Sequence, residues 1–64
     1  MAELITHLQF RDPDAAYVML VEARRGLSVE ATAELDTKLV LLLANHIGDL
    51  DVLRDAIALA KSAP

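Results

Sequence analysis

The chain has 64 residues, a net charge of −4 and no cysteine, with 55% hydrophobic but only 3% aromatic residues. A chain of this length forms one domain and buries only about 60% of the surface that it exposes when unfolded, so its core is thin. Without cysteine, disulfides and thiolate metal sites are excluded as aids to folding. A well-packed helical core of Leu, Val, Ile and Ala, oligomerisation, or both remain as the means of stabilising the fold.

The acidic composition also limits the possible partners. A surface of this sign repels nucleic-acid backbones and anionic lipid. The opening "MAELITHLQF" lacks the basic start and long apolar core of a signal peptide. Every apolar run is far shorter than the ~20 residues of a membrane span. We therefore expect a soluble, cytoplasmic protein that binds neither nucleic acid nor a membrane.

Residues 1–11 form an arm whose apolar side chains follow no regular period: Leu4, Ile5, Leu8 and Phe10. We expect this arm to pack across the helices that follow. A short helical turn and a strand added to a partner are the alternatives.

The first helix is expected at about 13–25. Asp12 is a suitable N-cap, and Pro13 suits the first helical position. Arg24 falls in the last turn, where a positive charge complements the helix dipole. Gly26 then ends the helix in the left-handed conformation, as in a Schellman motif.

Two further helices are expected at about 29–47 and 50–62, with Ser28 and Asp49 as their N-caps and Gly48 between them. Because both connections are short, consecutive helices should be antiparallel neighbours. The sequence therefore predicts an all-α domain over residues 12–64, built of three short helices in antiparallel succession and paired into a dimeric helical bundle.

The first two helices carry more apolar surface than one packed side can hide. The apolar arc of the second is clearly wider than the ~100° stripe of a surface helix, and such excess marks interaction sites. We expect a second chain to cover both helices, with the third outside, most simply as a two-fold homodimer. The expected interface residues are Val18, Met19, Val40, Leu41 and Ala44. Leu41, in the middle of the polar strip of the second helix, is the foremost candidate, because it alone in the run 39–44 is expected to point away from the buried spine of that helix. In the alternative, the arm covers the excess in a monomer.

His46 and Asp49, with Asn45 beside them, are the only residues that suggest chemistry. A His-x-x-Asp spacing suits acid–base work or metal ligation. A structural interpretation is favoured, because Asp49 caps a helix and His46 complements a helix C-terminus. His46 also continues the row Leu35, Leu39 and Leu42 toward the packed face. A small ligand-binding or minimal catalytic protein that uses these three residues is the alternative.

Other polar residues add no site. Asp36 is expected to pair with Arg24 or Arg25, and His7 near Glu3 offers too few metal ligands. No nucleophile motif or glycine-rich phosphate loop is present. The helix that a helix-turn-helix would place in DNA opens with the acidic "VEATAELDTK". We expect no enzymatic activity, cofactor or metal.

Two segments carry a family resemblance: "DPDAAYVMLVEARRGLS" and "LDTKLVLLLANHIGDLDVLRDAIALA". They resemble a family of small bacterial proteins classed as a domain of unknown function, number 2783, over about residues 12–60. The resemblance implies no established activity and no catalytic residues to transfer. It implies an accessory role beside flavin-dependent oxidoreductases of aromatic catabolism. The sequence therefore predicts a small acidic helical protein–protein interaction module, homodimeric and accessory to a metabolic enzyme. An antitoxin-like or transcriptional partner is a third possibility.

Overall fold

The computed structural model describes residues 3–62 and contains three helices: α1 (Pro13–Arg24), α2 (Val29–Ile47) and α3 (Leu50–Ser62). The prediction of an all-α, three-helix fold is confirmed. The bounds of α2 and α3 coincide with the expected ranges, and α1 ends one residue earlier than expected. Residues 1 and 2 of the expected arm, and residues 63 and 64 of the expected domain, lie outside the described residues.

Local hydrogen bonds explain where the helices begin. In each case a side-chain oxygen accepts a backbone N–H that has no partner inside the helix. The bonds run to Asp12 from Ala15 (3.1 Å), to Ser28 from Ala31 (3.1 Å) and to Asp49 from Val52 (3.0 Å). All three N-caps were expected from the sequence.

The two glycines end their helices in different ways. Gly48 (φ 63°) lies in the left-handed region and donates its N–H to the carbonyl of Ala44 (3.0 Å), as expected for a helix end. Gly26 (φ 77°) follows Arg25, which has already left the helix (φ −60°, ψ 129°). Leu27 donates to the carbonyl of Arg24 (3.2 Å), which makes this segment a type II turn. The expected Schellman motif is therefore wrong, because the chain leaves the helix at Arg25 rather than at Gly26.

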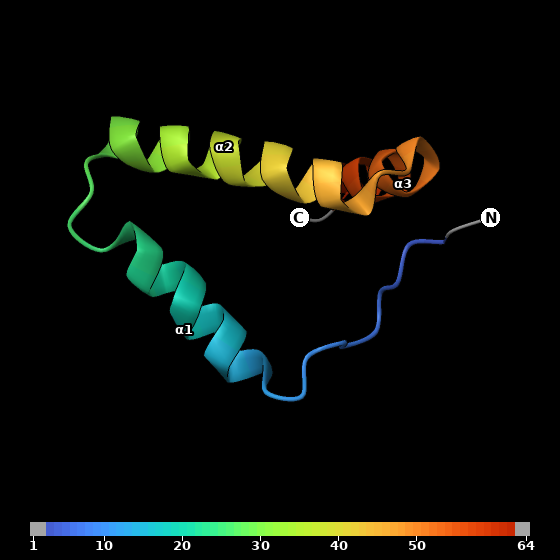
Figure 1. Ribbon diagram of the computed structural model, residues 1–64, viewed down its shortest axis with the longest axis horizontal. Coiled ribbons are helices and arrows are strands. Elements are labelled where there is room, and N and C mark those ends of the chain that lie inside the picture. Colours follow the sequence, from blue (N-terminus) through green and yellow to red (C-terminus); the bar gives the residue numbers. More distant parts are fainter. Residues whose placement is uncertain (1–2, 63–64) are drawn as a thin grey trace.

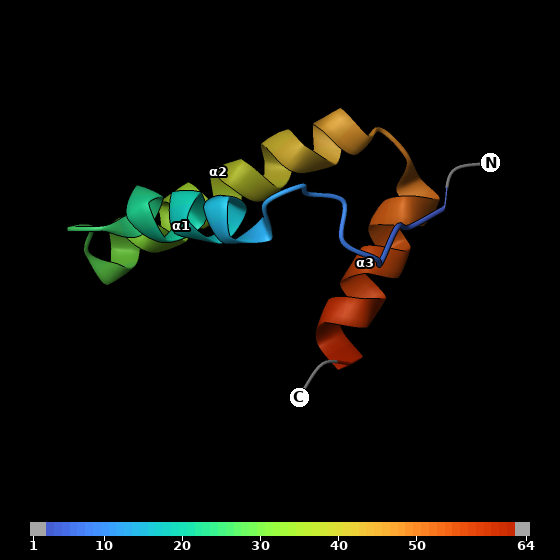
Figure 2. The same cartoon turned by 90° about the horizontal axis from the view of Figure 1, so that it is seen from below.

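The three helices form an open arrangement rather than a closed bundle. α1 and α2 are joined by the turn at 25–28 and diverge with distance from it (Figure 1). At the other end of α2 the chain changes direction sharply into α3 (Figure 2). α2 and α3 pack against each other where they meet. Short connections were expected to produce packed antiparallel neighbours, and this expectation is wrong for α1. The ion pair between Arg24 and Asp36 joins α1 to α2 beside the turn, and beyond this point the two helices diverge (Figure 1).

The open arrangement leaves almost no core within this chain. Among the described residues only Val52 is buried, with 8% of its surface exposed. The accessible surface is 5882 Å², whereas a compact protein of 7.0 kDa exposes about 4,000 Å². The radius of gyration is 13.5 Å, against about 11 Å for a compact chain of this length. Hydrophobic side chains therefore remain at the surface in number.

Candidate interaction surface

The exposed hydrophobic side chains are concentrated on α1 and α2. Among the most exposed of them in the middle of these helices are Met19 (73%), Leu42 (68%) and Leu41 (65%). Their exposed neighbours on α1 are Tyr17, Val18, Leu20 and Val21, and those on α2 are Val40, Leu43 and Ile47. Exposed apolar residues are common singly, but a contiguous group of this kind marks an interaction surface.

The charges stand apart from this apolar surface. Residues 15–21 of α1 and 39–44 of α2 carry no charge, and we call these two segments together the apolar band. Counted away from the contact between Arg24 and Asp36, both segments begin about 4 Å along their helices, and they end at about 14 Å on α1 and about 12 Å on α2, at 1.5 Å per residue. The band therefore occurs at one level of both helices. A helix that is apolar around most of its circumference needs neighbours on several sides.

The ion pair beside the turn connects α1 to α2. Arg24 donates to Asp36 at 2.5 Å and to the carbonyl of Leu20 at 2.8 Å, so of the two expected partners of Asp36 the structure selects Arg24. Arg25 instead donates to both carboxylate oxygens of Glu22, at 2.6 and 2.8 Å. This bidentate contact holds the pKa of Glu22 below and that of Arg25 above its usual value. Because both side chains of that pair are exposed, it contributes little to stability.

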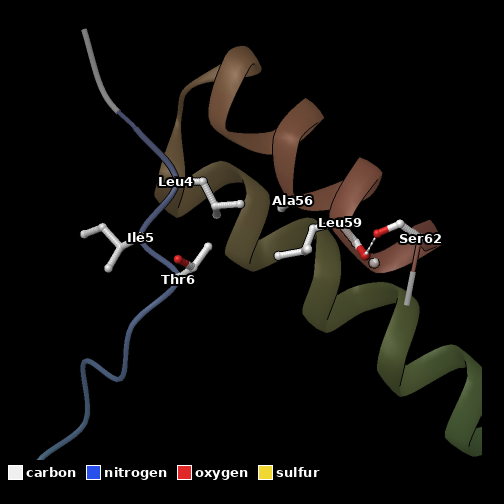
Figure 3. A pocket seen from close by; sticks show the side chains of 7 residues that line it. Leu4, Ile5, Thr6, Ala56, Leu59 and Ser62 are labelled. Carbon is white, nitrogen blue, oxygen red and sulfur yellow. Dashed lines mark hydrogen bonds between the residues drawn. The ribbon is translucent and has the colours of Figure 1, made fainter. Parts of the chain in front are cut away.

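The N-terminal arm does not cover the apolar band. The arm has no helix or strand between residues 3 and 12, and it passes from the start of α1 to α3 (Figure 2). Near its beginning Leu4 and Thr6 lie across an open crevice of about 430 Å³ from Leu59 of α3 (Figure 3). Leu8 and Phe10 are themselves exposed. The structure therefore gives no support to the alternative in which the arm hides the excess surface of α1 and α2.

The residues that suggested chemistry do not converge. Asp49 is engaged as the N-cap of α3, and it shares a shallow hollow of about 350 Å³ with Asn45. His46 does not line that hollow, and within residues 3–62 no hydrogen bond joins it to Asp49. His46 was expected to face a packed side, but it is exposed, because α1 diverges from α2 and does not lie along it (Figure 1). No group of three potential metal ligands occurs in the described part of the chain.

The expected interface residues are placed as follows. Val18, Met19, Val40 and Leu41 are exposed, and Ala44 is half-buried beside the start of α3. The expectation that Leu41 is the single exposed residue of the run 39–44 is wrong, because Leu42 is at least as exposed. Leu42 was missed because it lies at the border of the apolar arc, which was assumed to be fully covered. Its position one helical turn after Lys38, a residue of the polar strip, was the sequence signal that could have indicated its exposure.

These features define a small acidic all-α protein with a large uncovered apolar surface on two of its helices. None of the helices in the described part of the chain is long and apolar enough to cross a membrane. The chain belongs to the family described as "Protein of unknown function (DUF2783)", whose model matches residues 4–62, and the family resemblance seen in the sequence is confirmed. No curated protein and no solved structure matches the chain.

Proposed function

We propose that the protein is a small interaction module whose apolar band on α1 and α2 is covered by another polypeptide chain. The observation that carries this proposal is the excess accessible surface, about 1,800 Å² above that of a compact protein of the same mass. A specific interface of ordinary size takes about 800 Å² from each partner. Counted over the whole chain, the excess is therefore large enough for two such interfaces.

The physical basis of the function is the removal of apolar surface from water, which is the dominant favourable term in most protein association. The charged residues lie outside the band, so a partner can cover it without desolvating ionised groups. In one form of this proposal the partner is a metabolic enzyme, such as a flavin-dependent oxidoreductase, and the chain is its accessory subunit. A catalytic function is less well supported, since Asp49 is engaged as a helix cap and no hydrogen bond within residues 3–62 joins His46 to it.

The test compares two substitutions of exposed apolar residues by glutamate. Met19 lies in the band, whereas Val29 lies at the start of α2, outside it, and is also exposed. The protein isolated from cells that produce it naturally is expected to be in an assembly heavier than 7.0 kDa, as measured by light scattering. Met19→Glu should reduce the mass of that assembly, because it places a charge in the band, and Val29→Glu should not. A folded, monodisperse 7.0 kDa wild-type chain that retains no partner would contradict the proposal.

A further inference from the structure

One face of α2 presents four exposed residues around a shallow hollow of about 430 Å³: Lys38, Leu41, Leu42 and Asn45. We call these four residues the α2 stripe. Their spacing places them on one side of the helix, while Asp36, which contacts α1, points to nearly the opposite side. No residue of α1, α3 or the described part of the arm lines this hollow. The α2 stripe is therefore open to another chain.

The α2 stripe has the same pattern when it is read from either end. Its spacing is three, one and three residues, in the order polar, apolar, apolar, polar. If two copies of α2 lie antiparallel, with a two-fold axis between Leu41 and Leu42, each Leu41 meets Leu42 of the partner subunit. Each Lys38 then meets Asn45 of the partner subunit. The lysine ammonium is a pure donor and the asparagine side-chain carbonyl is an acceptor, so the outer positions are complementary.

We propose that the α2 stripe is the two-fold contact of a homodimer, formed by antiparallel packing of α2 against the same helix of a second copy. This inference rests on the proposed interaction function and names the partner chain. A two-fold interface uses the same patch on both subunits, which is what a self-complementary pattern provides. The four central leucines supply the apolar centre, and the two lysine–asparagine pairs form the polar rim that such interfaces show.

The available area and the charge both favour a second copy. The excess surface of about 1,800 Å² per chain exceeds the ~800 Å² that each partner contributes to an ordinary interface. The α2 stripe carries one positive charge and no negative charge, so two copies meet there without a pair of opposed carboxylates. An anionic lipid surface is a poorer occupant, because the chain as a whole carries a net charge of −4. Met19 and its neighbours on α1 lie outside this contact and remain for another partner.

The absence of cysteine from the chain allows a direct test with single-cysteine variants. In the proposed register position 38 faces position 45 of the partner subunit, within the Cα separation that a disulfide needs. Two copies of position 38 are instead about 10 Å apart along the helix axis, too far for a disulfide. We therefore expect a disulfide-linked species of 14 kDa, twice the chain mass, when reduced Lys38→Cys and Asn45→Cys proteins are mixed and the mixture is then oxidised by air. Each variant alone should give less than about a tenth of that product, and Ala58→Cys, on the polar side of α3, should give none with either partner.

The outcomes separate this inference from the proposed function. Light scattering of the full-length wild-type protein at micromolar concentration should give 14 kDa. Equal cross-linking of each variant alone would overturn the antiparallel register, and a trimer or tetramer mass would overturn the two-fold contact. A folded 7.0 kDa chain that binds a different protein with defined stoichiometry would overturn the homodimer but leave the interaction function standing. Co-sedimentation of the wild-type protein with phosphatidylcholine vesicles in place of self-association would overturn both.

Discussion

Replacement of Leu41 by lysine is the sharpest test of the apolar band and the α2 stripe together. Leu41 is 65% exposed in the isolated chain, and nothing in the described structure depends on it. A lysine at this position is compatible with the helix, because Lys and Leu have similar helix propensities. The substitution therefore removes no contact inside the chain, so its direct effect is on association.

The magnitude follows from the exposed surface of this side chain. Full burial of a leucine contributes about 1.5–3 kcal/mol, so covering the exposed 65% of Leu41 contributes about 1–2 kcal/mol per subunit. The two-fold symmetry doubles this to about 2–4 kcal/mol per dimer. At about 1.4 kcal/mol per tenfold change, the dimer dissociation constant should rise by roughly 30- to 700-fold.

The assay is sedimentation equilibrium over a dilution series, with circular dichroism to confirm that the helices are retained. Ala58→Lys is the matched control, since it also introduces one lysine at an exposed helical position but lies on the polar side of α3. Its dissociation constant should stay within about threefold of the wild-type value. If Leu41→Lys and Ala58→Lys dimerise equally well, the assignment of Leu41 to the contact is wrong.

Substitutions at three further positions test individual parts of the structure. Asp49→Ala removes the N-cap of α3 and should lower the free energy of unfolding by about 1 kcal/mol in denaturant titrations, whereas Asp49→Ser should restore most of it. Gly26→Ala should cost about 1–2 kcal/mol in the same assay, since φ is 77° and the added Cβ meets nothing within 4 Å, so only the backbone is strained. Asp36→Asn should cost about 0.5 kcal/mol at low salt, because its ion pair is half-exposed, and the difference should shrink at high salt.

The elements of this fold were predictable because their signals are local. Asp12, Ser28 and Asp49 each bond an N–H three residues ahead, and such bonds depend only on the residue type and its position before an apolar run. The positive φ of Gly26 and of Gly48 was foreseeable for the same reason. The orientation of α1 relative to α2 was not foreseeable, because it depends on whether the chain leaves the helix at Arg25 or at Gly26.

The candidate surface was only partly predictable, since exposure depends on how the helices are arranged. The width of the apolar arc correctly indicated that α2 carries more apolar surface than one chain covers. The prediction of which sides of α2 are covered assumed that α1 lies along α2. Because α1 does not, Leu42 and His46 are exposed where they were expected to be covered. A periodic pattern identifies a face of a helix, but the neighbour of that face is determined by contacts between distant residues.

Folding and association are coupled in a chain of this kind. With Val52 as the buried residue of the described part, the isolated chain has little apolar burial to set against the conformational entropy that three ordered helices cost. A partner that binds only the folded form stabilises it by about 2.7 kcal/mol when its concentration is a hundred times the dissociation constant. For a homodimer the partner concentration is the protein concentration, so the midpoint of thermal unfolding should rise as the protein is concentrated. Leu41→Lys should weaken this dependence in the accessible concentration range, because it reduces the fraction of chains that are paired without removing a contact inside the chain.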